Sequence, residues 1–148
     1  MNLRRRNRHR LFTIEDANRA LPLVRAIVRD LMPLWREVRD RQSRLEELTK
    51  HHQLAVRDEV SDELTQAQEQ LEADAERLTV YINELRDLGA EPMGPEGLVD
   101  FPAKVNGRLV HLCWKFDEPE VRFWRELSDP TFERRNLVRA LGGDQISA

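Results

Sequence analysis

Apolar residues recur every three or four positions over the first half of the chain, which is the spacing of one face of an α-helix. From Thr13 onward, spacings of three and four alternate. The apolar positions are Ile14, Ala17, Leu21, Val24, Val28, Leu31, Trp35 and Val38; Gln42 interrupts the series, and Leu45 resumes it. This alternation is typical of the stripe along which helices pair as coiled coils. A long helix is therefore predicted, with Thr13 and Asp16 capping its first turn.

A second stretch with the same spacing predicts another helix from about Asp58 to Leu88, and Gly89 is suited to end it. Its apolar positions are Val60, Leu64, Ala67, Leu71, Leu78, Tyr81, Leu85 and Leu88. Asp74 interrupts this stripe. It either accepts a hydrogen bond from the Trp35 indole, helps to set the helix register, or points to solvent.

Together the two helices predict an antiparallel hairpin. Residues 49–57 connect the helices as a loop or as a frayed continuation of either helix. Pro22 and Pro33 lie off the apolar stripe, so we expect them to bend the first helix rather than divide it. A lone hairpin buries one stripe only, so either a second copy or the C-terminal region must cover it. We favour a homodimer.

After residue 90 the pattern changes from helical to strand-like. Gly and Pro residues at 91–97 predict a loop. The turn dipeptide Asn106-Gly107 lies between two apolar runs, at 98–105 and 108–116, and predicts a β-hairpin. We expect a short turn or helix at 121–127.

The predicted fold class is mainly α, with a long, coiled-coil-like helical hairpin followed by a small β-hairpin and a short C-terminal helix or turn. One domain of this size is typical for 148 residues. We divide the chain into a basic disordered arm at 1–12 and a domain at 13–148. The domain comprises the helical hairpin at 13–89, the β-hairpin block at 97–127 and a loosely ordered tail at 128–148.

The β-hairpin register places chemically active side chains on one strand face. A two-residue turn aligns Asp100 with Cys113 and sets His111 beside them, with opposed Cβ atoms about 5 Å apart. A carboxylate, an imidazole and a thiolate together suit a divalent metal, zinc first. Glu118 and Glu126 are near enough in sequence to supply another oxygen ligand.

Two other interpretations of this cluster stay open. Cys113 could be a nucleophile with His111 as its base. Alternatively the cluster is structural, with a buried thiol, an exposed imidazole, and an Asp100 that caps the turn or pairs with an arginine. The sequence has no Cys-x-x-Cys or His-Glu-x-x-His motif, no phosphate-binding glycine loop and no serine nucleophile elbow.

Composition narrows the function classes further. The chain is 40% hydrophobic and 34% charged, which suits long helices with one apolar stripe. No apolar run approaches the ~20 residues that span a bilayer, so no membrane partner is expected. A single cysteine cannot form an internal disulfide, which fits a reducing, cytoplasmic location.

Five arginines and no acidic residue lie in the first twelve positions. They are Arg4, Arg5, Arg6, Arg8 and Arg10. Without them the chain has 19 basic and 27 acidic residues, so a basic arm precedes an acidic body. Such an arm can contact nucleic acid. A solvated tail is the favoured interpretation, because no basic face with interleaved aromatic residues extends the patch into the body.

The chain contains the segments FTIEDANRALPLVR at 12–25, GLVDFPA at 97–103 and GRLVHLCWKFDEPEVRFWREL at 107–127. Together they resemble a bacterial family of uncharacterised proteins, the domain of unknown function 2203. The resemblance covers nearly the whole chain. It implies small cytosolic proteins with a long helical hairpin and a strand-rich block, and it implies no reaction.

The resemblance also implies a set of candidate site residues, namely Asp100, Cys113, Glu118 and Arg134. The family pattern has a histidine after the second tryptophan of the third segment, and Arg125 takes its place here. If that histidine is a metal ligand, this chain lacks it, or His111 substitutes from the neighbouring strand.

These observations lead to two functional hypotheses. The first is a cytosolic homodimer of helical hairpins with a small polar pocket for a divalent metal. The second is a non-enzymatic interaction or scaffold protein that uses its helical surface and arginine arm, with nucleic acid as one partner class. The sequence assigns no reaction or substrate.

Overall fold

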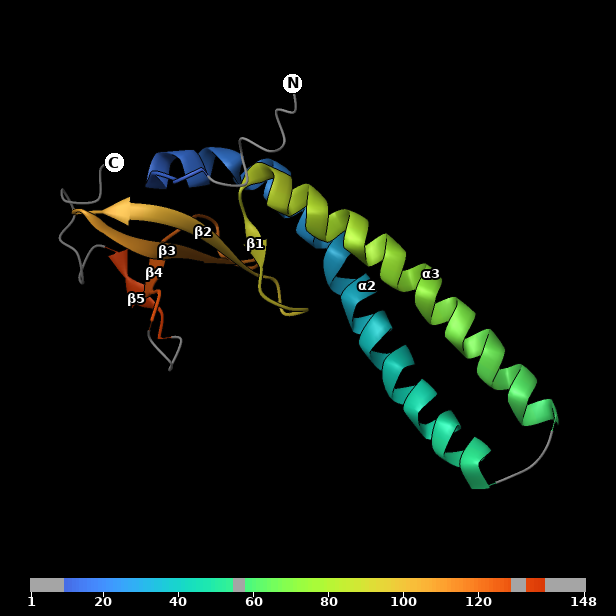
Figure 1. Ribbon diagram of the computed structural model, residues 1–148. Helices are drawn as coiled ribbons and strands as arrows, with labels where there is room; N and C mark the ends of the chain where they lie inside the picture. Colours follow the sequence, from blue (N-terminus) through green and yellow to red (C-terminus); the bar gives the residue numbers. More distant parts are fainter. Residues whose placement is uncertain (1–9, 55–57, 129–132, 138–148) are drawn as a thin grey trace.

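The computed structural model describes residues 10–54, 58–128 and 133–137, in which two long helices precede a small sheet (Figure 1). Helix α2 spans Ile14–Leu54 and helix α3 spans Asp58–Leu88. The predicted helical hairpin is therefore confirmed. Most of the predicted connection at 49–57 is helical, because α2 continues through Leu54.

The start of α2 is fixed by the predicted cap. The backbone N–H of Asp16 donates to Thr13 Oγ1 at 2.9 Å, and the N–H of Thr13 donates back to Asp16 Oδ2 at 3.3 Å. The bond from the Thr13 backbone holds the pKa of Asp16 below its usual value. Pro22 and Pro33 both lie inside one continuous helix. Figure 1 shows that this helix bends along its length, as expected for interior prolines.

Within the described part of the chain, five antiparallel strands form one sheet in chain order. They are β1 (Glu91–Pro92), β2 (Leu98–Val105), β3 (Arg108–Lys115), β4 (Phe123–Glu126) and β5 (Arg135–Asn136). The predicted turn or helix at 121–127 is wrong, because β4 lies there. Pairing with the open edge of β3 buries Trp124, and that burial outweighs the local preference for a turn. A fifth strand also lies within the region assigned to a loose tail.

The register of the β2–β3 hairpin is the predicted one. Asn106 and Gly107 have φ values of 52° and 80°, the left-handed conformations that a two-residue type I′ turn requires. Asp100 pairs with Cys113, and His111 pairs with Pro102. One strand face therefore carries the acid, the thiol and the imidazole, while the alternate residues point to the helices.

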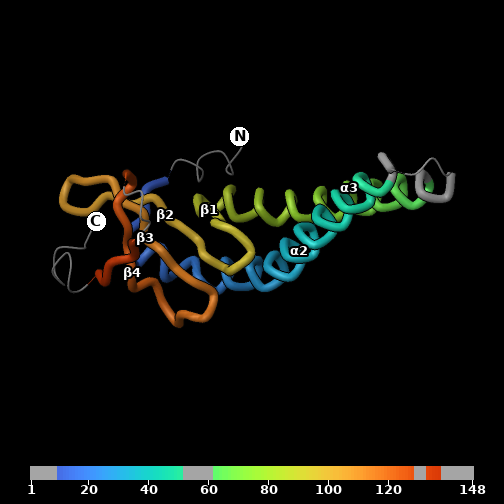
Figure 2. Tube along the Cα trace, turned by 90° about the horizontal axis from the view of Figure 1, so that it is seen from below, coloured from blue at the N-terminus to red at the C-terminus, as the bar shows by residue number. Residues whose placement is uncertain are grey.

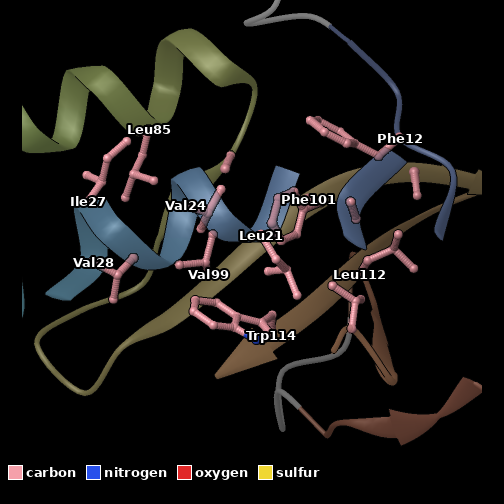
Figure 3. Close-up of a cluster of buried hydrophobic side chains, with 14 of the residues drawn as sticks. Phe12, Leu21, Val24, Ile27, Val28, Leu85, Val99, Phe101, Leu112 and Trp114 are labelled. Atoms are coloured by element: carbon pink, nitrogen blue, oxygen red, sulfur yellow. The ribbon is translucent and has the colours of Figure 1, made fainter. Parts of the chain in front are cut away.

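The core lies between the other face of the sheet and the N-terminal half of α2 (Figure 3). Leu21 and Val24 of α2 pack toward Phe101 and Trp114 of the sheet, and all four side chains are buried. Phe12 covers the outer edge of β2, where its N–H donates to the Pro102 carbonyl at 2.7 Å. This buried cluster holds the sheet against α2.

The far half of the hairpin extends away from the sheet (Figures 1 and 2). We call α2 residues 39–54 and α3 residues 58–74 the distal hairpin. Its stripe contains Asp74, which is 3% exposed and pairs with Arg41 Nε across the hairpin at 2.7 Å. The interpretation that Asp74 points to solvent is therefore wrong. The carboxylate joins α3 to α2 as a role in helix register requires, but its partner is Arg41, which the sequence pattern did not indicate.

Candidate functional site

The sheet face that points away from the helices gathers the predicted site residues. Asp100 and Cys113 are directly paired, and His111 lies two residues along β3 on the same face. Strand β4 adds Arg125, which pairs with His111. Sequence spacing found the first three side chains, whereas Arg125 joins them only because β4 pairs with β3.

Asp100 and Arg125 form a buried ion pair at the centre of this face. The Arg125 Nε donates to Asp100 Oδ2 at 3.0 Å, and its Nη2 donates to the same oxygen. Asp100 is 3% exposed and Arg125 is 8% exposed. A buried carboxylate without such a partner would be costly. This arrangement agrees with the structural interpretation, in which Asp100 pairs with an arginine.

His111 lies at the side of the ion pair and is neutral at pH 7. Burial lowers its pKa, the charge of Arg125 lowers it further, and Asp100 offsets part of the effect. Its Nδ1 is 3.7 Å from Asp100 Oδ2, which is too long for a hydrogen bond. Among the described residues this nitrogen has no hydrogen-bond partner. The ring lines a hollow of about 290 Å³ between the end of α3 and the sheet.

Cys113 is the buried member of the cluster, at 2% exposure. Burial raises its pKa above that of a free thiol, and the neighbouring Asp100 carboxylate raises it further, while Arg125 and Arg134 oppose the shift. The Sγ lies 3.8 Å from the His111 carbonyl oxygen. A protonated, buried thiol is a poor nucleophile. The geometry therefore gives no support to the interpretation of Cys113 as a nucleophile.

Glu118 fastens the loop that follows β3. Its Oε1 accepts hydrogen bonds from the Lys115 backbone N–H at 2.8 Å and from Arg134 Nη2 at 2.5 Å. Its carbonyl oxygen accepts from the Trp114 indole at 2.9 Å and from Arg25 Nη2 of α2 at 3.0 Å. Glu118 is thus held by four donors and does not turn toward Asp100.

Glu126 lies on the opposite face of the sheet. It is the last residue of β4 and pairs with Val110 of β3, and its carboxylate contacts Arg108 Nη2 at 3.2 Å. Successive strand residues alternate between faces, so the strand that brings Arg125 to the site takes Glu126 away from it. The structure therefore does not bring together the five predicted metal ligands.

The predicted metal site is consequently only partly assembled. Within the described residues, no three His, Cys, Asp or Glu side chains have an arrangement that could hold a metal ion. A metal at Asp100 and Cys113 would have to displace the Arg125 guanidinium and the thiol proton, since thiolate is the binding form. Metal binding remains a prediction, and it would require that these contacts be broken.

The site residues implied by the family resemblance do converge. Asp100, Cys113 and Arg134 line a cavity of about 70 Å³, together with Arg125, and Glu118 holds Arg134 from outside. Met93 and Leu98 complete the wall. The period of two along β2 already places Leu98 on the same face as Asp100. Spacing gave no signal for Met93, because it lies in the loop between β1 and β2, whose path only the tertiary structure shows.

The arginine arm lies mostly outside the described residues. Arg4, Arg5, Arg6 and Arg8 fall there, and only Arg10 is described. Arg10 Nη2 contacts Asp16 Oδ1 at 3.3 Å, and its guanidinium lies 4.6 Å from the Phe12 ring centre. The C-terminal end of the arm is thus anchored to the domain. Its proposed contact with nucleic acid remains a prediction.

Comparisons with known proteins relate the sequence of this chain to one family. Neither described helix has a stretch apolar and long enough to cross a membrane. No significant match was found among curated proteins or among solved structures. A family profile described as an uncharacterised conserved protein, DUF2203, matches residues 10–137. This range includes the helical hairpin and all five strands, and the chain therefore belongs to the DUF2203 family.

Proposed function

We propose that this protein is a homodimeric interaction protein that assembles through its distal hairpin. The supporting observation is the incomplete burial of the apolar stripe there. The leucines concerned are Leu45, Leu48, Leu64 and Leu71, each only half-buried between α2 and α3. In the near half of the hairpin, where the sheet adds a second layer, Leu21 and Leu85 are 3% and 0% exposed.

A second hairpin would cover these leucines and complete a four-helix bundle. No more than about a third of each leucine is still exposed, so burying the remainder contributes about 0.5–1 kcal/mol for each side chain. Four leucines from each of two copies therefore contribute roughly 4–8 kcal/mol. Association itself costs about 4–15 kcal/mol. We consequently expect a dimer that forms and dissociates over an accessible concentration range rather than a permanent one.

The charges of the two helices support a particular arrangement of the copies. The α3 range, 58–88, has ten acidic and two basic residues, whereas the α2 range, 14–54, has seven acidic and eight basic residues. Two α3 helices placed side by side would repel each other. Contact between α3 of one copy and α2 of the other avoids this repulsion.

Sedimentation of the full chain over a concentration series tests this proposal. The wild-type protein should shift from monomer to dimer, and a variant with Leu48→Gln and Leu64→Gln should remain monomeric at the same concentrations. The matched control is Leu23→Gln, because Leu23 is 54% exposed on the near half of α2. Circular dichroism checks that helix content is kept. A wild-type monomer up to the solubility limit would refute the proposal.

A further inference from the structure

The hollow beside His111 gives access to one nitrogen of its ring. Nδ1 is enclosed by the protein and lies 3.7 Å from Asp100 Oδ2. The His111 side chain is nevertheless 25% exposed, and it lines the hollow of about 290 Å³ at the end of α3. Nε2 is therefore the accessible nitrogen, and it has no hydrogen-bond partner among the described residues. A ligand in the hollow can reach Nε2 without displacing a protein contact.

The charges around this hollow cancel, which favours an uncharged ligand. Arg86 and Glu91 both line it and form a two-point ion pair, with Nε donating to Oε2 at 3.0 Å and Nη2 to Oε1 at 2.8 Å. Beside the imidazole, Asp100 and Arg125 neutralise each other. The imidazole itself is uncharged at pH 7, because burial lowers its pKa. An ionic ligand would lose hydration here and gain no charge that lacks a partner.

The walls of the hollow define the class of uncharged ligand. The other described residues that line it are apolar, namely Gly89, Ala90 and Pro102. Small-molecule pockets have volumes of about 300–1,000 Å³, so a hollow of about 290 Å³ suits a ligand of one ring. Glu91 holds the Arg86 guanidinium in one plane, on which an aromatic ring can stack. A hydroxyl on that ring can pair with either tautomer of His111, because a hydroxyl both donates and accepts.

We propose that this hollow binds a phenol, with the hydroxyl on His111 Nε2 and the aromatic ring against the Arg86 guanidinium. The phenol is either a free small molecule or the side chain of a tyrosine in a peptide, and the two sources can be separated by experiment. The hollow lies at the C-terminal end of α3, whereas the distal hairpin lies at the other end. The site therefore goes beyond the proposed dimer and does not depend on it.

Nuclear magnetic resonance of the full chain tests the proposal through the Cε1–Hε1 signal of His111, which the spectrum of His111→Phe identifies. Phenol, toluene and cyclohexanol are titrated in parallel, and we expect a saturable shift of this signal with phenol. Toluene lacks the hydroxyl and should bind about tenfold more weakly, the loss of one hydrogen bond. Cyclohexanol lacks the aromatic face and should also bind more weakly than phenol. Tighter binding of N-acetyltyrosinamide than of phenol would indicate a peptide, and equal or weaker binding would indicate a free phenol.

Substitution of His111 provides the second measurement. His111→Phe keeps a ring but removes the nitrogen, so ligand-detected saturation transfer should show phenol binding about tenfold weaker and toluene binding unchanged. His51→Phe is the matched control, since His51 is exposed on α2, and it should bind phenol as the wild type does. No saturable shift with phenol, or toluene binding as tight as that of phenol, would overturn the proposal even if His111→Phe fails to fold. Cyclohexanol binding as tight as that of phenol would also overturn it, because the ring contact with Arg86 would then contribute nothing.

Discussion

The buried ion pair between Asp100 and Arg125 should be the most sensitive polar contact of the sheet. Asp100→Asn removes the negative charge and leaves the guanidinium of Arg125 buried, with its side chain 10% exposed. Breaking one side of a buried pair costs about 3–5 kcal/mol. For a domain of this length, 1 kcal/mol corresponds to roughly 3–4 °C in melting temperature. We therefore expect a decrease in Tm of about 10–20 °C.

The assay is thermal and urea unfolding followed by circular dichroism, applied to four proteins and one control. The four proteins are the wild type, Asp100→Asn, Arg125→Met, and the double variant that combines the same two substitutions. Because the double variant leaves no buried charge unpaired, it should lose less free energy of unfolding than the two single losses added together. Glu120→Gln is the control, since the pair between Glu120 and Arg122 is more than half exposed; it should change stability by less than about 0.5 kcal/mol. Strictly additive losses, or a loss below about 1 kcal/mol in Asp100→Asn, would refute this reasoning.

Three further predictions concern a glycine, the histidine and the cysteine. Gly97→Ala should destabilise the protein by about 1–3 kcal/mol more than Gly107→Ala in urea unfolding. The two glycines have similar positive φ values, +86° and +80°, so the backbone strain of an alanine is similar at both. A Cβ at Gly97 would lie 2.8 Å from Phe116 Cβ, whereas a Cβ at Gly107 would have nothing within 4 Å. The pKa of His111 is lower in the folded state than in the unfolded chain. As the pH decreases, the unfolded chain therefore binds a proton first, and the free energy of unfolding should fall below about pH 6.5. If the dependence of this free energy on pH is the same in His111→Gln as in the wild type, the prediction is wrong. Cys113 should react with a thiol reagent at pH 8 only after denaturant is added, and rapid labelling of the native protein would show that the thiol is not buried as described.

Local patterns in the sequence were sufficient for the helical hairpin and for the β2–β3 pairing. The cap at Thr13 and the alternating apolar spacing specify where α2 begins and which face it buries, because both depend on residues three or four positions apart. Asn106-Gly107 fixes the register in the same way, because a two-residue turn leaves no freedom in the pairing. The juxtaposition of Asp100 with Cys113 followed directly from that register.

The sequence alone did not identify β4 or β5. Strand β4 has four residues and β5 has two, and segments this short are stable only when an existing strand edge supplies hydrogen bonds and a core accepts their side chains. The sequence around Trp124 is equally compatible with a turn. Its position in the sheet is decided by the burial of the indole, which is 1% exposed.

The same tertiary pairing decided the chemistry of the site. Pairing of β4 with β3 brought Arg125 onto Asp100 across 25 residues, and packing of α2 on the sheet brought Arg25 onto the Glu118 carbonyl across 93 residues. No local spacing rule relates residues so far apart. The sequence by itself determined which side chains share a strand face, because that depends on the period of two in one hairpin. Only the tertiary structure decided that a guanidinium neutralises the acid there, because charge compensation depends on which distant segments share the buried space.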